Sequence, residues 1–267
     1  MNHALNLRGE LVVITGASAG LGAEYARQFA KRGAKLLLVA RRKELLENLC
    51  DEIRKNYSSE VSYRVVDLTA SASEPSYKQF LDELRSSSVM VLVNNAGFGS
   101  FGQFEALDIE KEVAMTRLNV EATLRTVHAV LPKMKERRSG AILSIASVAA
   151  FQALPYMSTY AGTKSFNLMH SMGLRYEVAE FGIRVVTVCP GPTETEFNGV
   201  ARVPGTATGS RRDDPVKVVA ESIMALDRNS PFVVTGFRSK LMKWGITTLP
   251  RGAVTWCVGR AMRQALR

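Results

Sequence analysis

A short apolar segment that runs directly into a glycine-rich turn most constrains the fold of this chain. Leu11–Ile14 is followed without a break by T15-G-A-S-A-G-L-G22, and apolar residues then recur at helical spacing from Ala23. Between a strand and a helix, glycines let a phosphate approach the backbone, and the free N–H groups of the helix N-terminus bind it. The alternative is a tight turn without a ligand, but the flanking strand and helix favour phosphate binding.

Strands and helices alternate along the remaining chain. Apolar runs predict further strands at 35–40, 61–66, 89–93, 141–146, 183–188 and 232–234. Helical patterns separate them, including a long helical stretch at 104–137, and Asp214-Pro215 begins another helix. This alternation predicts one α/β domain over residues 1–267. Residues 196–214 are rich in Gly, Thr, Arg and Pro, which indicates either a mobile loop over a substrate or disorder without function.

Composition indicates a folded protein of a reducing compartment. Hydrophobic residues make up 46% of the chain and charged residues 22%, which is typical of a globular core. Cys50, Cys189 and Cys257 are scattered and odd in number, so we expect neither a disulfide framework nor a metal site. We find no signal-peptide pattern and no run of the ~18 apolar residues that a membrane span requires. We therefore expect a cytoplasmic protein.

Positive charge is concentrated near the C-terminus. Residues 228–267 hold eight basic residues and no acidic one, which leaves only +2 of the net charge of +10 for the other 227 residues. The body is thus not a nucleic-acid surface. Residues 237–267 form a basic amphipathic extension with Val254, Cys257, Val258, Ala261, Met262 and Ala265 on one helical face and Arg260, Arg263 and Arg267 on the other. The apolar face could cover the protein itself, another subunit or an anionic membrane, and its small residues favour packing over membrane.

Three residues in the second half of the chain could perform proton transfer. Tyr160 and Lys164 are four residues apart, so they share one face of a helix. An ammonium group near the phenol would lower the tyrosine pKa and make it a proton donor or acceptor. Ser147 follows a buried strand, at the edge where open parallel sheets bind ligands. A Tyr and a Lys at this spacing can equally decorate a helix surface, so other motifs have to decide.

The end of the second expected strand indicates which dinucleotide would bind. Many dinucleotide-binding folds place an acidic residue there for the ribose 2′-hydroxyl, but this chain has Ala40, Arg41, Arg42 and Lys43. Arginine binds phosphate through two hydrogen bonds, so we predict NADP(H) rather than NAD(H). The alternative is a solvated basic helix start, which would oppose the helix dipole.

Several motifs together resemble one known family. T-G-x-x-x-G-x-G at 15–22, N94-N-A-G97 after the fourth strand, Ser147 and Y-x-x-x-K at 160–164 are similar to the classical branch of the short-chain dehydrogenase/reductase family over nearly the whole chain. The resemblance implies a doubly wound parallel sheet of the Rossmann type, with about seven strands and helices on both faces. It also implies a homodimer or homotetramer.

The resemblance further implies which residues bind NADP(H). It places Gly16, Ser18, Ala19, Gly20, Leu21 and Gly22 at the pyrophosphate, Asn95, Ala96 and Gly97 at the adenosine ribose, and Pro190, Gly191, Thr193, Thr195, Tyr160 and Lys164 at the nicotinamide end. Asp67 and Leu68 would border the adenine, although Asp67 could equally cap the following segment. Asn119 matches the family's helix asparagine, which holds a water in a proton relay.

The expected activity is the NADP(H)-dependent interconversion of a carbonyl compound and an alcohol. Tyr160 would be the general acid or base, Lys164 would hold the nicotinamide ribose, and Ser147 would position the substrate oxygen. An apolar small-molecule substrate is favoured by Phe98, Phe101, Phe104, Phe151, Leu154, Met157 and Phe197. The alternatives are a catalytically silent dinucleotide-binding sensor or scaffold, and a membrane-surface reductase of lipid carbonyls.

Overall fold

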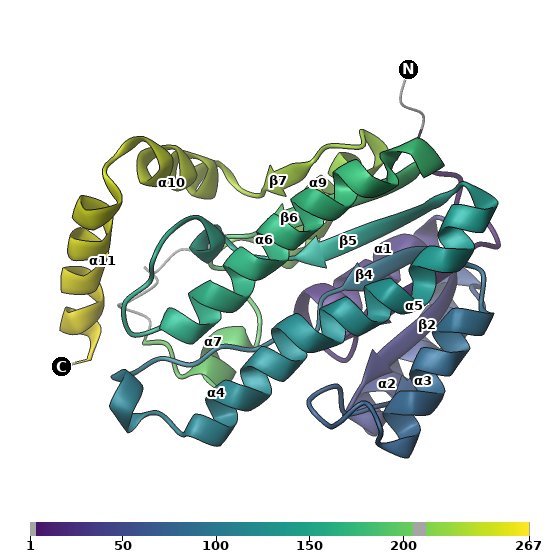
Figure 1. The fold of residues 1–267 in the computed structure, drawn as a ribbon. Helices are drawn as coiled ribbons and strands as arrows, with labels where there is room; N and C mark the ends of the chain where they lie inside the picture. Colours follow the sequence, from purple (N-terminus) through teal and green to yellow (C-terminus); the bar gives the residue numbers. More distant parts are fainter. Residues whose placement is uncertain (1–3, 205–211, 267) are drawn as a thin grey trace.

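A seven-stranded parallel sheet forms the centre of the molecule, which a computed structural model describes at residues 4–204 and 212–266 (Figure 1). Its strands are β1 (Leu11–Thr15), β2 (Lys35–Ala40), β3 (Val61–Val65), β4 (Val89–Asn94), β5 (Gly140–Ile145), β6 (Ile183–Cys189) and β7 (Phe232–Val234). Their order across the sheet is β3-β2-β1-β4-β5-β6-β7. The predicted fold class, strand number and strand positions are confirmed, with differences of one residue at some strand ends.

Successive side chains of a strand point to opposite sides of the sheet. Because the strand residues are apolar on both sides, helices cover both faces. Val12 and Ile14 pack on α1 (Gly20–Lys31), α2 (Lys43–Tyr57) and α9 (Pro215–Asp227). Val13, on the other face, belongs to a core with α3 (Pro75–Ser86), α5 (Ala122–Arg137) and α6 (Ser158–Val178). The predicted helix start at Asp214-Pro215 is confirmed, since Asp214 caps α9 and accepts a hydrogen bond from the Val216 N–H.

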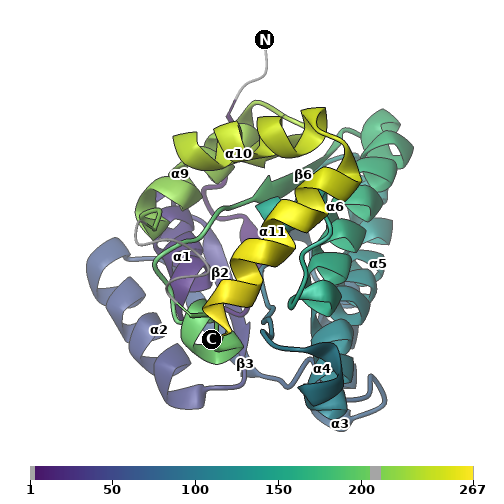
Figure 2. The same cartoon turned by 90° about the vertical axis from the view of Figure 1, so that its left-hand side faces the viewer.

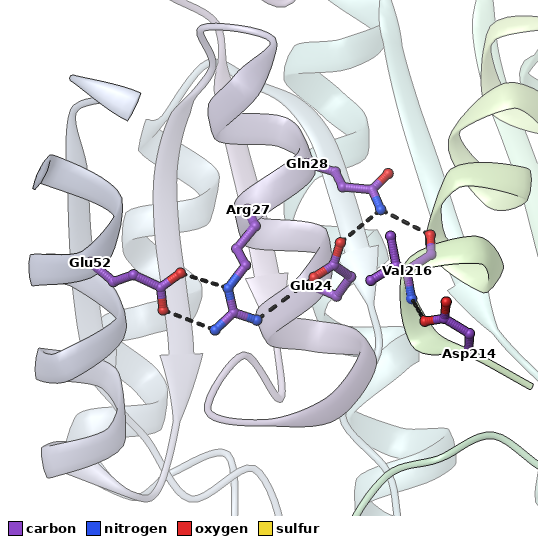
Figure 3. A network of polar contacts seen from close by, with 6 residues as sticks. All are labelled: Glu24, Arg27, Gln28, Glu52, Asp214 and Val216. Atoms are coloured by element: carbon purple, nitrogen blue, oxygen red, sulfur yellow. Dashed lines mark hydrogen bonds and ion pairs between the residues drawn. The ribbon is translucent and has the colours of Figure 1, made fainter. Parts of the chain in front are cut away.

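A polar network joins the three helices of the first face (Figure 3). Arg27 of α1 donates two hydrogen bonds to Glu52 of α2, at 2.7 and 2.9 Å. Gln28 donates to Glu24 at 2.8 Å and to the Val216 carbonyl of α9 at 3.0 Å. Helix α1 is therefore fixed on both sides, which holds its N-terminus in place at the sheet edge.

The chain changes direction in the sheet between β1 and β4. After β1 it proceeds outward to β2 and β3, and it then returns to pair β4 on the other side of β1. At such a switch point the loops beyond the carboxyl ends of the two strands part and leave a crevice. The turns that begin at Gly16 and at Asn95 both lie at this point.

Two expected segments differ from the structure. The helical stretch predicted at 104–137 is divided into a 3-10 turn (Phe104–Ala106), α4 (Ile109–Thr116), a π-helical segment (Arg117–Glu121) and α5. Within the loop predicted at 196–214, residues Phe197–Ala201 form the short helix α7, while residues 205–211 lie outside the described part of the chain.

Two helices at the C-terminus complete the molecule at one end (Figures 1 and 2). Helix α10 (Phe237–Thr248) follows β7, and α11 (Arg251–Ala265) follows α10. Val254 is buried, and Val258 and Met262 pack against a cluster that includes Leu154. The prediction that this apolar face packs on protein rather than on membrane is confirmed for these residues, which contact the chain itself, although Cys257 is exposed.

The sequence assigned Arg267 to the opposite face of this helix, but that residue lies outside the described residues. In the described parts of the chain, no helix combines the length and the apolar character needed to cross a bilayer.

Candidate active site

A cavity of about 610 Å³ lies at the carboxyl ends of the strands and brings together nearly all the predicted site residues. It is lined by Gly16, Ser18, Ala19, Gly20, Leu21, Arg41, Arg42, Asp67, Leu68, Asn95, Ala96, Gly97, Ser147, Tyr160, Lys164, Pro190, Gly191, Thr193 and Thr195. Gly22 and Asn119 are predicted site residues that do not line it.

The N-terminus of α1 offers this cavity unpaired backbone N–H groups. Its N-cap is Ala19, which makes no side-chain capping bond, and its first turn contains no acidic residue. Gly16 and Gly20 adopt φ of 65° and 55°, which glycine tolerates and other residues rarely do. An uncapped helix end beside such a turn suits an anion, so these residues fit the pyrophosphate of a dinucleotide.

Gly22 has a packing function in the structure. A Cβ at this position would lie 2.2 Å from the Gly16 carbonyl oxygen and 2.6 Å from the Asn95 amide nitrogen. The missing side chain thus lets α1 approach the turn that precedes it. Its predicted contact to the cofactor stays a prediction.

Thr15 fixes the two loops of the crevice to each other, a role that the sequence did not indicate. Its Oγ1 accepts hydrogen bonds from the N–H groups of Asn95 and Ala96, both at 3.1 Å. The Asn95 side chain donates in return to the carbonyl oxygens of Thr15 and Gly16, at 3.0 and 3.1 Å. Asn95 therefore holds the glycine turn in addition to lining the cavity.

Two arginines line the cavity directly after β2. Arg42 donates to the Ser18 hydroxyl at 3.1 and 3.2 Å and forms an ion pair with Glu196 at 2.8 Å. Arg41 lies 3.8 Å from a carboxylate oxygen of Asp67. Lys43, the third cation of the motif, is not part of the cavity lining and instead pairs with Glu47 on α2.

Asp67 caps the segment after β3 and also lines the cavity. Its carboxylate accepts hydrogen bonds from the N–H and the hydroxyl of Thr69, at 2.9 and 2.7 Å. The same residue lines the cavity beside Leu68. The predicted capping role is therefore confirmed, and its place beside the adenine stays a prediction.

Ser147, Tyr160 and Lys164 approach the cavity from two elements. Ser147 follows β5 and caps a 3-10 turn, where its Oγ accepts a hydrogen bond from the Ala149 N–H at 3.2 Å. Tyr160 and Lys164 lie one turn apart on α6, with relative exposures of 8% and 4%. The Lys164 ammonium lies 5.8 Å from the centroid of the Tyr160 ring and donates to the Ile145 carbonyl at 2.7 Å.

Burial dominates the acid–base properties of this group. It raises the pKa of Tyr160 to about 12, against the effect of a hydrogen bond with Ser147, which lowers it. Burial also lowers the pKa of Lys164 to about 8. The prediction of a lowered tyrosine pKa is wrong for this arrangement, because desolvation disfavours the phenolate. The phenol therefore keeps its proton at neutral pH and is suited to donate it.

Asn119 does not line the cavity but holds two of the segments that form it. It is completely buried in the π-helical segment. Its amide donates to the Phe98 carbonyl and the Thr163 hydroxyl, both at 3.0 Å, and its oxygen accepts from the Phe98 N–H at 3.2 Å. Thr163 in turn donates to the Tyr160 carbonyl at 2.8 Å. Asn119 thus connects the loop after β4 to the helix that carries Tyr160.

The end of the cavity beyond Tyr160 is apolar. Phe98, Leu154, Met157 and Phe197 line it, as predicted, together with Val200, Val203, Met242, Val258, Ala261 and Met262. The Phe197 and Tyr160 rings lie 5.2 Å apart. The predicted Phe101, Phe104 and Phe151 do not line the cavity, and Phe104 is 62% exposed.

Metal ligands were not expected from the sequence. Within residues 4–204 and 212–266, no group of three or more His, Cys, Asp or Glu side chains could hold a metal ion. His3, one of the three histidines, lies outside the described residues.

Comparisons with known proteins agree with this geometry. A family model described as short chain dehydrogenase matches residues 10–203. An uncharacterised oxidoreductase of Staphylococcus saprophyticus is 31% identical over 85% of this chain and 94% of its own length. A very-long-chain 3-oxoacyl-CoA reductase of Anas platyrhynchos is 33% identical over 73% of this chain, but this match spans only 63% of the length of that relative.

A solved structure extends the likeness to three dimensions. The short-chain dehydrogenase from Sphingobium yanoikuyae in complex with NADPH superposes with a TM-score of 0.81 at 31% identity. The match covers 90% of this chain and 96% of that one. With the family model, the fold and the arrangement of Ser147, Tyr160 and Lys164, it shows that the chain belongs to the short-chain dehydrogenase family.

Proposed function

We propose that this protein is an NADPH-dependent reductase that converts an apolar ketone or aldehyde to the alcohol. The observation that carries the proposal is the position of Ser147, Tyr160 and Lys164 in the same cavity as the uncapped N-terminus of α1. A dinucleotide seated by its pyrophosphate at α1 extends toward these three residues. When bound, NADPH supplies the hydride that reduces a carbonyl carbon.

The protein's own groups handle the substrate oxygen and its proton. Ser147 donates a hydrogen bond that positions the carbonyl oxygen. Tyr160, whose pKa is raised to about 12, gives that oxygen its proton. Lys164 contributes positive charge beside the phenol, and Asn119 holds the backbone around Phe98 and Thr163 so that Tyr160 keeps its position.

The cofactor preference rests on the two arginines at the adenosine end. A 2′-phosphate there would gain charge-assisted hydrogen bonds from Arg41 or Arg42. The relative in complex with NADPH supports the same choice.

The substrate class rests on the apolar end of the cavity. Its apolar side chains can contact a long acyl chain or a polycyclic carbonyl compound over a large area. A free sugar would find few hydrogen-bond partners there. The very-long-chain 3-oxoacyl-CoA reductase among the relatives supports a long apolar substrate. A homo-oligomeric state and a cytoplasmic location stay predictions from the sequence.

NADPH oxidation with ketones of graded chain length tests the proposal. We expect turnover that rises with apolar chain length, and a loss of roughly 100-fold or more in kcat for Tyr160→Phe, because general acid catalysis contributes about that much. The matched control is Tyr176→Phe, which removes the hydroxyl of an exposed tyrosine on the same helix. Unchanged turnover in Tyr160→Phe would contradict the mechanism. NADPH binding without turnover of any ketone would favour the catalytically silent dinucleotide-binding protein.

A further inference from the structure

Helix α10 presents an apolar stripe to the outside of the molecule. Phe237, Leu241 and Trp244 follow one another at helical spacing and share one side of the helix. They are 81%, 60% and 65% exposed, whereas Ser239 on the opposite side is buried. A surface helix normally turns its apolar side inward, so the orientation of α10 is the reverse of the usual one.

Two further large apolar residues after the stripe are also exposed to solvent. Leu249, between the two helices, is 58% exposed, and Trp256 on α11 is 65% exposed. We call the five residues Phe237, Leu241, Trp244, Leu249 and Trp256 the tail surface. Figures 1 and 2 show α10 and α11 together at one end of the molecule. Large apolar side chains that gather in this way mark a binding surface more often than chance exposure.

The charge around the tail surface indicates the chemistry of its partner. Residues 237–266 contain six basic residues and no acidic one, and Lys240 forms an ion pair with Glu221 of α9 at 2.9 Å. Arg238 and Arg251 lie at the starts of α10 and α11, and Arg260 stacks over the Trp256 ring at 5.7 Å. Tryptophan and basic side chains together are typical of helices at the interface of an anionic membrane. A second copy of the chain would instead bring like charges together.

The inner side of the same two helices forms part of the cavity wall. Met242 of α10 and Val258 and Met262 of α11 line its apolar end. The helix pair therefore separates the substrate end of the cavity from the tail surface. If the tail surface lay on a bilayer, the substrate end of the cavity would lie next to the lipid, on the other side of this helix pair.

We propose that α10 and α11 seat this protein on the surface of an anionic lipid bilayer, with the tail surface inserted at the level of the headgroups. Delivery of substrate from the lipid additionally rests on the proposed function. The residues that bind the bilayer are not the ones that the sequence indicated. Val254, Val258 and Met262 pack inward. The residues that contact lipid are instead those of the outward-facing stripe of α10.

Intrinsic fluorescence provides a direct test, because Trp244 and Trp256 are the only two tryptophans of the chain. The full-length protein is titrated with phosphatidylcholine vesicles that contain or lack phosphatidylserine, at low and raised salt. We expect a blue shift of the emission and co-sedimentation with the anionic vesicles, both weakened by salt. Brominated lipids should quench the emission, and Trp244→Phe and Trp256→Phe assign the quenching to each helix.

A double variant tests whether the stripe on α10 is responsible for vesicle binding. Phe237→Ser with Leu241→Ser should weaken vesicle binding by roughly tenfold or more, since two exposed apolar side chains lose their burial in lipid. Neither residue lines the cavity, so NADPH oxidation with a short, water-soluble ketone should not change. The matched control is Tyr176→Ser, which removes a side chain that is 88% exposed on α6.

The outcomes separate the possible occupants. Absence of both the blue shift and co-sedimentation with anionic vesicles would overturn the proposal. Self-association without vesicles that the double variant abolishes would identify a second copy as the occupant and would overturn it as well. Vesicle binding is measured without cofactor or substrate. Its result therefore does not depend on whether the proposed reductase activity is found. Delivery from lipid is supported if the double variant loses turnover only with a ketone carried in vesicles.

Discussion

The buried pair of Tyr160 and Lys164 shows what individual residues contribute to this site. Their spacing along the chain places both on one side of α6, and the structure confirms that both line the cavity. Their pKa values are set by burial, which depends on segments as distant as β5 and α7. The positions could be predicted from the sequence, but the direction of the tyrosine shift could not.

The lysine makes the stability of the cofactor-free protein depend on pH. Burial lowers the pKa of Lys164 from 10.5 to about 8, so between these values the unfolded chain binds a proton that the folded chain lacks. The free energy of unfolding therefore rises with pH in this window. The Tyr160 pKa, raised from 10.0 to about 12, acts in the opposite direction only above pH 10.

We expect the free energy of unfolding of wild type, relative to Lys164→Met, to rise by roughly 2 kcal/mol between pH 8 and pH 10. Methionine keeps an unbranched chain at the site and removes the titrating group. Urea unfolding at each pH measures the difference. A constant difference between the two proteins would contradict the lowered lysine pKa.

The pair of Arg42 and Glu196 gives a second prediction at this scale, about the cofactor. Arg42→Gln should weaken NADPH binding about 10- to 100-fold and leave NADH binding nearly unchanged, because only the 2′-phosphate loses its partner. Glu196→Gln should strengthen NADPH binding several-fold, since Glu196 competes for the same guanidinium. Titration of each variant with NADPH and NADH measures these affinities. Lys43→Gln is the control, because Lys43 does not line the cavity. Equal losses for the two cofactors would refute a 2′-phosphate site.

Among the secondary-structure elements, the π-helical segment around Asn119 was the least predictable. The sequence at 104–137 is compatible with one long helix, and strands with their following turns were recognised from local patterns. The break at Arg117–Glu121 accompanies hydrogen bonds from Asn119 to Phe98 and Thr163. These partners are 21 and 44 residues away, so no local pattern indicates the break.

Removal of this connection should affect both stability and turnover. Asn119→Leu removes the hydrogen bonds to the Phe98 N–H, the Phe98 carbonyl and the Thr163 hydroxyl, and we expect a loss of roughly 3 kcal/mol in the free energy of unfolding. The kcat should also fall, because Thr163, which donates to the Tyr160 carbonyl, is no longer connected to the loop after β4. Asn167→Leu is the matched control, since Asn167 is buried on α6 but its Oδ1 has no hydrogen-bond partner among the described residues. The assigned role fails if both variants lose equal stability and keep their activity.

For the whole molecule, the sequence predicted the dinucleotide end of the cavity better than the substrate end. The first is built from short motifs that directly follow strands, so the parallel order of the sheet brings them together. The second combines the loop after β4, α7 and the C-terminal helices. The orientation of α10 and α11 depends on packing against distant segments, which a helical pattern alone does not specify.

The width of the substrate end should set the chain length that the enzyme accepts. Met262 lines the apolar end from α11, and Met262→Trp adds volume there. We expect kcat/KM for long-chain ketones to fall about tenfold, while short ketones react as before. Met224→Trp on the exposed side of α9 is the control. A uniform loss for all chain lengths would indicate general distortion and contradict the assignment.

The distribution of thiols has a practical consequence for studies of the C-terminal helices. Cys50 and Cys189 are buried in the core, whereas Cys257 on α11 is exposed. A maleimide dye or spin label will therefore attach to the native chain at α11 alone, without engineered mutations. On the same helix, five residues further along, Met262 borders the cavity. The label is thus placed to report, in real time, whether this wall shifts as substrates enter and products leave.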